Sequence, residues 1–234
     1  MQTNGADALK REAARKALEY VESGMILGLG TGSTIAHFLQ LLGQALQDGS
    51  LQDIVGVPTS IRTGREARQE GIPLESLVER PKLDLTVDGA DEVDPALNLI
   101  KGMGGALLRE KMVAQASDRF IIIADERKVV QRLGEVSALP VEVVDWGYAV
   151  HIGFMEEQGA QVSVRKFEDG PPFKSDNGNV ILDCTFPDGI ADPEGLDAVL
   201  HSRAGVVETG LFLGMAELAV IAGAEGVRLM EGRS

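Results

Sequence analysis

Apolar and polar residues follow one regular pattern over about the first 132 residues of the chain. Short runs that are apolar on both faces occur at 25–30, 53–60, 83–87 and 120–125. Stretches with helical spacing of apolar residues flank and separate them, at 6–22, from the turn after 30 to about 45, at 62–71 and at 105–117. Short strands without a polar face, alternating with helices, are typical of a parallel sheet covered on both faces. We therefore predict an α/β fold for this part.

The pattern changes after about residue 133. The segments LPVEVV, AQVSVRKF and NVILDCTF show strand-like alternation, and one helix is predicted at 193–203. The tail carries LAVIAG and GVRLM on either side of a glycine turn, which predicts a hairpin or strand pair. The sequence thus predicts a parallel-sheet domain over 1–132 and 213–234, and a smaller α+β domain over 133–212.

Composition narrows the class of protein. The chain has 234 residues, of which 44% are hydrophobic and 25% charged, as in ordinary globular proteins. It has no run of eighteen apolar residues, so we expect no membrane span, and its polar N-terminus lacks the apolar core of a signal peptide. Its single cysteine, Cys184, excludes an internal disulfide, fits a reducing cytoplasm and leaves no cysteine cluster for zinc.

The formal net charge of −14 argues against a nucleic-acid partner, because nonspecific nucleic-acid binding needs a basic surface. It also bears on small ligands. An anionic substrate that approaches an acidic protein must be held by local donors, such as backbone N–H groups at a helix start and a few lysines.

The loop GLGTGST at 28–34 stands between a predicted strand and the helical pattern TIAHFLQLL. Glycines let a backbone approach a ligand closely, and hydroxyls at Thr31, Ser33 and Thr34 add donors for phosphate oxygens. The loop is neither a Walker loop, since the lysine is missing, nor a complete GxGxxG. A phosphate site and a tight turn capped by Ser33 or Thr34 both remain open.

A second cluster of polar residues lies in LDLTVDGADEVDPALNLIKGMGGALLREK, at 83–111. Asp88 and Asp91 follow a predicted strand, at the end where open α/β sheets bind ligands. Glu110 is a candidate base for aldose–ketose isomerisation, and Lys101 and the N–H groups of Gly102–Gly105 are candidate donors to an enediolate. The alternative is a solvated acidic turn and helix surface.

That alternative is the expectation for three neighbours of the cluster. We expect Glu92, Asp94 and Lys111 to be solvated, since charge runs usually face water.

Seven motifs together resemble ribose-5-phosphate isomerase, type A. They are GLGTGST, VDGADEVD, IKGMGGALLREK, FIIIADERK, LPVEV, GNVILD and GVVETGLF, in the order typical of that family, and the match runs from about Leu9 to the C-terminus. The resemblance implies a Rossmann-like parallel-sheet catalytic domain with a smaller α+β domain, assembled as a homodimer or homotetramer.

The resemblance also implies a function. Family members interconvert ribose 5-phosphate and ribulose 5-phosphate, a step of the pentose phosphate pathway, in the cytoplasm and without metal or organic cofactor. The family's general base falls on Glu110, and the groups that assist ring opening and stabilise the enediolate fall on Asp88, Asp91 and Lys101. The implied phosphosugar-binding residues are Lys10, Thr31, Gly32, Ser33, Thr34, Gly89, Ala90, Gly102, Met103, Gly104 and Lys128.

Met103 departs from the three consecutive glycines that some members carry after the lysine. If the Met103 side chain points outward and only its backbone N–H is used, we expect the turn to survive. A change in affinity would be the consequence.

Two other functions compete with an isomerase. A phosphosugar-sensing module would bind without converting, but the acidic chain shows no helix-turn-helix or basic arm. A nicotinamide-dependent oxidoreductase is disfavoured by the incomplete GxGxxG.

Overall fold

The structure is a computed structural model that describes residues 3–167 and 170–232. Its contacts divide the chain into two compact units. The first unit comprises residues up to 90, 109–128 and those from 214 onward, and the second comprises 91–108 and 129–213. Within the described part of the chain, no helix is both long enough and apolar enough to cross a membrane.

A six-stranded sheet forms the first unit, in the order β13-β12-β6-β3-β1-β2. Its strands are β1 (Ile26–Leu29), β2 (Val55–Pro58), β3 (Leu83–Asp88), β6 (Ser117–Asp125), β12 (Leu218–Gly223) and β13 (Gly226–Glu231). Its helices are α1 (Thr3–Leu18), α2 (Ser33–Asp48), α3 (Ile61–Gln69), α4 (Leu107–Gln115) and the 3₁₀ helix η1 (Glu126–Lys128). Neighbouring strands are parallel except the β12–β13 pair, so the predicted parallel sheet and terminal hairpin are both confirmed.

The sheet has a buried core on each face. Leu27, Leu29 and Val87 pack with α1 and α2 on one face, where buried apolar side chains form the larger core. On the other face, Val113 of α4 comes so close to Gly28 that an added Cβ would lie 2.6 Å from its Cγ1. A strand that is apolar on both sides is therefore what this position between two helical layers requires.

The second unit contains two smaller sheets. Strands β7 (Leu139–Val143), β8 (Gln161–Val164), β9 (Val180–Thr185) and β10 (Val206–Thr209) pair antiparallel in the order β10-β7-β9-β8. Strands β4 (Glu92–Val93), β5 (Leu99–Ile100) and β11 (Leu211–Phe212) form the other sheet. Helices α5 (Val150–Glu157) and α6 (Pro193–His201) complete an α+β unit.

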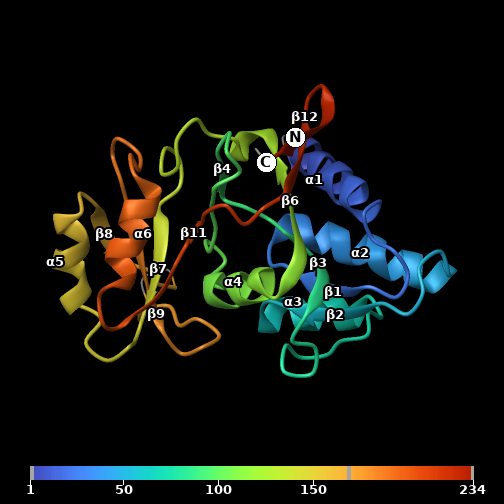
Figure 1. The fold of residues 1–234 in the computed structure, drawn as a ribbon, viewed down its shortest axis with the longest axis horizontal. Helices are drawn as coiled ribbons and strands as arrows, with labels where there is room; N and C mark the ends of the chain where they lie inside the picture. The colour runs from blue at the N-terminus through green and yellow to red at the C-terminus, as the bar shows by residue number, and fades with distance from the viewer. Residues whose placement is uncertain (1–2, 168–169, 233–234) are drawn as a thin grey trace. The chain divides into compact units, whose positions relative to one another are not determined.

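Alternation along β7 and β9 gives the four-stranded sheet two different faces. Helices α5 and α6 lie beside this sheet (Figure 1). Val141 and Leu182 pack into a core with Met155 of α5 and Leu200 of α6. Residues one step along, such as Asp183, therefore point to the opposite face, because successive side chains alternate across a strand.

The contact division differs from the predicted domain boundaries at residues 91–108. The sequence pattern leaves this segment within the first domain, whereas its contacts group it with the second unit. The reason is that β4 and β5 pair with each other and β5 pairs with β11, which lies at 211–212. Two-residue strands give almost no periodic signal, so the pattern could not reveal this pairing.

Candidate functional site

Three segments with predicted site residues lie at one edge of the six-stranded sheet. The loop 30–34 follows β1, Asp88 ends β3, and Lys128 in η1 follows β6. The strands are adjacent and parallel, with Leu29 opposite Val87 and Asp88 opposite Ile122. Their carboxyl ends therefore meet, which is where open α/β sheets bind ligands.

Asp88 is fully buried and tied to this edge by backbone donors. Its Oδ1 accepts hydrogen bonds from the Thr31 N–H at 3.0 Å and the Gly89 N–H at 2.7 Å. Such bonds to a carboxylate are stronger than those between neutral groups. Gly30 makes room for them, because a Cβ there would lie 2.1 Å from Asp88 Oδ1. The loop 30–34 and Asp88 therefore hold each other in place.

The Thr31 hydroxyl lies in a cluster that the sequence did not indicate. Its Oγ1 is 2.8 Å from Thr59 Oγ1, 2.9 Å from Ser60 Oγ and 2.9 Å from Thr63 Oγ1. Ser60 is also the N-cap of α3 and accepts from the Thr63 N–H. The Thr31 side chain therefore holds the loop, and donation from this hydroxyl to a phosphate stays a prediction.

The rest of the loop enters α2, the helix whose start was predicted to hold phosphate. Gly32, with φ of 131°, precedes the helix, and Ser33 and Thr34 form its first turn. The Lys10 ammonium donates to Ser33 Oγ at 2.8 Å. Free N–H groups and a lysine at a helix start favour an anion.

Glu110 stands in the first turn of α4 and is 3% exposed. The helix α4 precedes β6, and a helix that returns the chain to a parallel strand begins near the carboxyl ends of the strands. The glutamate thus belongs to the end of the first unit that carries the loop and Asp88. Gly89 and Ala90, which follow Asp88, are half-buried.

Asp91 and Lys101 come together in the second unit. Asp91 precedes β4 and Lys101 follows β5, and these strands pair with Glu92 opposite Ile100. The Lys101 N–H donates to Gly210 O at 2.9 Å, and its ammonium lies 5.4 Å from the Phe212 ring centroid. With 2% exposure, Lys101 is among the largest buried side chains of the described residues.

The glycine turn after Lys101 uses several of its own donors. Gly102 and Gly105 have φ of 102° and 80°, which a side chain would strain. The Gly105 N–H donates to Gly102 O at 2.9 Å, and the Met103 N–H donates to Asp91 Oδ2 at 2.9 Å. Met103 is 48% exposed, so the condition under which we expect the turn to survive, an outward side chain, is met. Gly104 is exposed.

The expectation that three neighbouring charges are solvated is wrong for two of them. Glu92 is fully buried and Lys111 is 6% exposed, whereas Asp94 is half-buried. Glu92 accepts N–H groups from Gly134 at 2.6 Å and Val136 at 2.7 Å. A buried carboxylate is tolerated because these donors satisfy it.

One group of side chains in the second unit has the composition of a metal site. Ligand atoms of Asp197, His201 and Glu208 lie within 4.8 Å of one another. However, His201 Nδ1 is 3.3 Å from Asp197 Oδ1, and Nε2 is 3.0 Å from Glu208 Oε1. The two carboxylates face opposite ring nitrogens, so the arrangement bridges α6 and β10 by hydrogen bonds.

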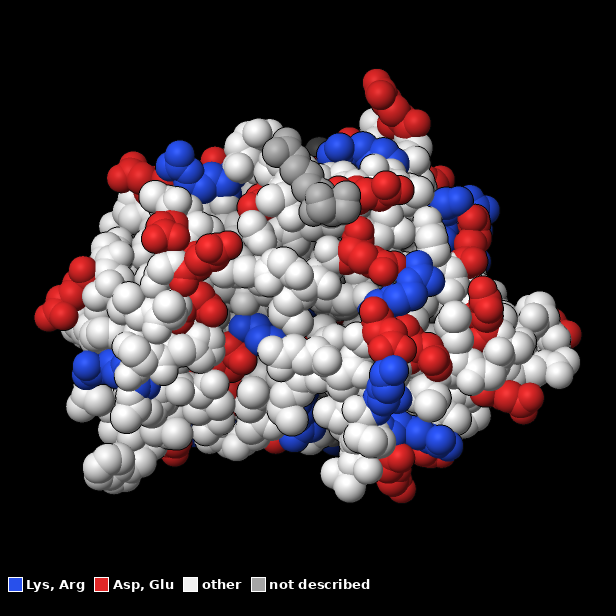
Figure 2. Space-filling model, in the orientation of Figure 1, with Lys and Arg blue, Asp and Glu red and all other residues white. Residues whose placement is uncertain are grey.

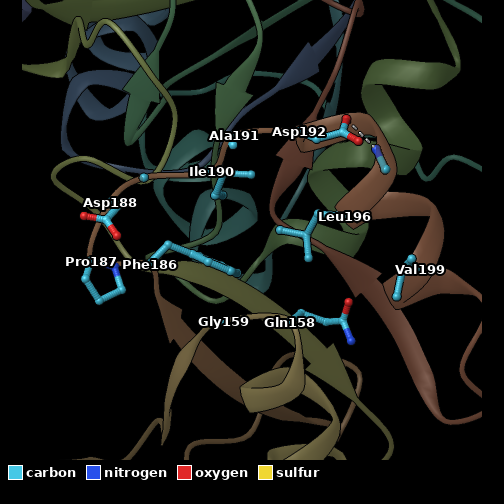
Figure 3. Close-up of a pocket in the computed structure, with 12 residues that line it drawn as sticks. Gln158, Gly159, Phe186, Pro187, Asp188, Ile190, Ala191, Asp192, Leu196 and Val199 are labelled. Atoms are coloured by element: carbon cyan, nitrogen blue, oxygen red, sulfur yellow. Dashed lines mark hydrogen bonds between the residues drawn. The ribbon is translucent and has the colours of Figure 1, made fainter.

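A cavity of about 390 Å³ opens in the second unit, between the 186–192 segment, α6 and the end of α5 (Figure 3). Its polar groups include Asp188 and Asp192, and Asp192 caps α6 by accepting from the Gly195 N–H. Among its described lining residues there is no predicted site residue. The carboxylates of its lining would repel a phosphate, so we do not assign the substrate to it.

The surface charge agrees with the need for local donors. Acidic side chains are scattered among basic ones over the face shown in Figure 2, and the described residues on it form no continuous basic patch. An anion therefore depends on the loop–helix N–H groups and the few lysines described above.

Comparisons with known proteins agree on one family. A profile of the family Ribose 5-phosphate isomerase A (phosphoriboisomerase A) matches residues 55–226. Ribose-5-phosphate isomerase A of Desulfatibacillum aliphaticivorans is 52% identical over 225 residues, covering 96% of this chain and 97% of the relative. That of Roseiflexus castenholzii is 54% identical over 222 residues, covering 95% and 94%.

Solved structures give the same result. Ribose 5-phosphate isomerase from Plasmodium falciparum superposes with a TM-score of 0.94 at 40% identity, covering 97% of this chain and 100% of that one. A D-ribose-5-phosphate isomerase in complex with phospho-erythronic acid also gives 0.94 at 40% identity, covering 97% and 99%. These likenesses confirm the Rossmann-like α/β fold with its smaller α+β part. The chain belongs to the ribose 5-phosphate isomerase A family, whose enzymes interconvert ribose 5-phosphate and ribulose 5-phosphate in the pentose phosphate pathway.

Proposed function

We propose that Glu110 is the general base of this isomerase and that the first unit, with its β1 loop, carries both this base and the phosphate site. The observation that carries the proposal is the edge of the six-stranded sheet. There Asp88, fixed by two backbone N–H groups, adjoins a helix start that Lys10 reaches through Ser33. A phosphate needs such donors in a protein of net charge −14.

The phosphate end of the sugar binds at the start of α2. The backbone N–H groups of Gly32, Ser33 and Thr34, the Ser33 hydroxyl and the Lys10 ammonium are its donors. Thr31 contributes its backbone position, since its hydroxyl is used by the cluster beneath the loop. Lys128, which follows β6 at the same edge, supplies a further positive charge.

Proton transfer takes place at C1 and C2 of the open-chain sugar. The Glu110 carboxylate removes the C2 proton of the aldose, and the electrons of that bond form the C1–C2 double bond of an enediolate. O1 gains a proton, the O2 hydroxyl loses one, and Glu110 returns its proton to C1. The C2 carbonyl of the ketose results, and the carboxylate is regenerated.

Asp88, Asp91 and Lys101 act on the sugar oxygens O1 and O2. Two carboxyl groups move the protons of ring opening and of O1 and O2, while the Lys101 ammonium offsets the charge of the enediolate. Gly89, Ala90 and the turn residues Gly102, Met103 and Gly104 complete the contacts to the sugar. This chemistry requires no metal or organic cofactor, in keeping with the family.

Glu110→Gln tests the proposal. The amide keeps the shape of the side chain but cannot accept the C2 proton, so turnover of ribose 5-phosphate should fall by at least about 100-fold, the lower end of what general-base catalysis contributes. Binding of phospho-erythronic acid, the ligand of the solved relative, should persist.

The matched control is Glu217→Gln, which alters a half-exposed glutamate paired with Arg119 in the first unit and should leave turnover unchanged. Wild-type turnover in Glu110→Gln would reject Glu110 as the base. A wild-type protein that binds the sugar phosphate but never converts it would support the sensing module instead.

We also propose that the protein is a homodimer or homotetramer of the cytoplasm. Trp146 is 91% exposed and Val150 64% exposed in the second unit, and large exposed apolar side chains are typical of protein contacts. A lone buried cysteine suits a reducing compartment. Sedimentation of wild type and Trp146→Ser measures the mass directly, and a monomeric wild type would contradict the assembly.

A further inference from the structure

The glycine turn after Lys101 needs an external brace. Gly102 and Gly105 both have positive φ, and glycine is the residue that loses the most conformational freedom on folding. An internal hydrogen bond, from the Gly105 N–H to Gly102 O, closes the turn. A donor site built on such a turn is accurate only if other groups fix its peptide planes.

Arg165, the first residue after β8, supplies that brace. Its Nη1 donates to Gly102 O at 2.8 Å and to Met103 O at 3.1 Å. The guanidinium is held in turn by Asp183 of β9, whose Oδ2 accepts from Nε at 2.9 Å and whose Oδ1 accepts from Nη2. The Arg165 and Asp183 side chains are only 11% and 17% exposed, so this fork is largely shielded from water.

Peptide planarity carries the effect of Arg165 to the site. The Gly102 carbonyl and the Met103 N–H belong to one rigid peptide unit. Arg165 donates to the Gly102 oxygen of this unit, and the Met103 N–H of the same unit donates to Asp91 Oδ2 at 2.9 Å. The next unit joins the Met103 carbonyl, also held by Arg165, to the Gly104 N–H, whose direction is thereby fixed.

Phe173, which follows Arg165 in the chain, packs against Gly105 at the other end of the turn. An added Cβ at Gly105 would lie 2.5 Å from Phe173 Cζ, so the ring fits closely against the glycine. Phe173 and Arg165 are joined through the backbone, since the Phe173 N–H donates to Arg165 O at 2.8 Å. The Arg165 N–H donates in turn to Ile181 O of β9 at 2.9 Å. Arg165 is therefore itself placed by the four-stranded sheet.

We propose that Arg165, held by Asp183, is a positioning residue of the isomerase that orients the Gly104 N–H and the Asp91 carboxylate through the peptide units of the turn. This inference rests on the proposed roles of Asp91 and the turn. On this proposal Arg165 acts through these groups and not on the substrate itself. Its positive charge beside two carbonyls also polarises both peptide units and strengthens their N–H donors.

The test compares Arg165→Ala, Arg165→Lys and Asp183→Asn with wild type. A misplacement of about 1 Å can cost on the order of 100-fold in rate, so Arg165→Ala should lose about that much kcat. KM should change much less, because the affected groups act on oxygens that gain charge in the transition state. Arg165→Lys, which offers one ammonium in place of the fork, and Asp183→Asn should lose less.

Two further measurements distinguish a positioning role of Arg165 from an effect on overall stability alone. Added guanidinium ion should restore part of the turnover of Arg165→Ala, and amide hydrogen exchange at Met103 and Gly104 should speed up in the variant. The control is Arg119→Ala, which removes a more exposed arginine whose Nε and Nη2 lie 2.8 and 2.7 Å from Glu217 Oε1, and which should keep turnover.

Wild-type kcat in folded Arg165→Lys and Arg165→Ala, beside an active wild type, overturns the positioning role and leaves the isomerase proposal standing. The role is also overturned if kcat falls only in parallel with the melting temperature, without guanidinium rescue. An inactive wild type overturns the proposed function, and this inference with it.

Discussion

Gly30→Ala is the substitution whose effect follows most directly from the geometry of the site. Gly30 is the residue after β1, and its φ lies outside the left-handed region, so an alanine suffers no backbone strain there. The difficulty is space. The new Cβ would lie 2.1 Å from Asp88 Oδ1, 2.3 Å from its Cγ and 2.6 Å from its Cα.

The size of the displacement can be worked out from these contacts. Ordinary van der Waals contact begins near 3.4 Å, so Asp88 Oδ1 must retreat by the difference between 3.4 and 2.1 Å, which is 1.3 Å. Rotation of the side chain is no remedy, because the Asp88 Cα is itself too close. Strands β1 and β3 must separate locally, and the carboxylate must leave the N–H groups of Thr31 and Gly89.

Two consequences follow for Gly30→Ala. Loss of two hydrogen bonds to a charged group costs about 1.5–3 kcal/mol each, so the free energy of unfolding should fall by several kcal/mol. Displacement of Asp88 by more than 1 Å should lower kcat by about 100-fold or more. Both are measurable, by urea denaturation and by a coupled assay of ketose formation well below the melting temperature.

The control is the same chemical change where the added methyl group has room. Gly153 lies inside α5, and a Cβ there meets nothing within 4 Å. Gly153→Ala should keep wild-type turnover and gain up to about 1 kcal/mol of stability from helix propensity. Wild-type kcat in folded Gly30→Ala would refute the reasoning, because Asp88 would then tolerate the displacement or play no part in the reaction.

Three further predictions concern the second unit. Burial, and to a smaller extent the charge of Arg203, lowers the pKa of His151 below its ordinary 6.5, so the folded state favours the neutral ring. The contribution of His151 to stability should therefore be complete above pH 6.5 and fall as the pH drops below it. Melting curves measured against pH should show this fall in wild type and a smaller one in His151→Asn. Burial raises the pKa of the Cys184 thiol to about 12, so a disulfide reagent at mildly alkaline pH should label it only after denaturation; rapid labelling of native protein would contradict this. Asp192→Ala should cost about 1 kcal/mol in urea unfolding by removing the cap on the Gly195 N–H, while Asp192→Asn should not.

Much of the fold could be predicted because its strands are strongly patterned. The runs at 25–30, 83–87 and 120–125 are apolar on both faces, and they form the parallel strands β1, β3 and β6 between two helical layers. The contacts of 91–108 could not be predicted from its pattern, because β4 and β5 have two residues each and β11, the partner of β5, is more than a hundred residues away.

Part of the site could likewise be predicted from local motifs, whereas another part depends on residues that are distant in the sequence. The glycine loops and the acids around them are local motifs, and family resemblance gave them roles. Arg165 was missed because its importance comes from Gly102, which lies 63 residues earlier, and from Asp183, which lies across the β8–β9 connection. Its only sequence signal was a charged residue at the end of an alternating strand, which usually means solvent exposure. The Thr31 hydroxyl cluster likewise needs the pairing of β1 with β2.

The most direct measurement for the account is isomerisation of ribose 5-phosphate in D₂O, followed by NMR, in wild type and Glu110→Gln. Transfer of a proton through a carboxyl group predicts that wild-type protein forms ribulose 5-phosphate with solvent deuterium at C1, and that repeated turnover also labels C2 of the aldose. Glu110→Gln should neither form ketose nor exchange the C2 proton. Ketose formation or C2 exchange that survives at wild-type rates in Glu110→Gln would contradict a glutamate-driven enediolate mechanism.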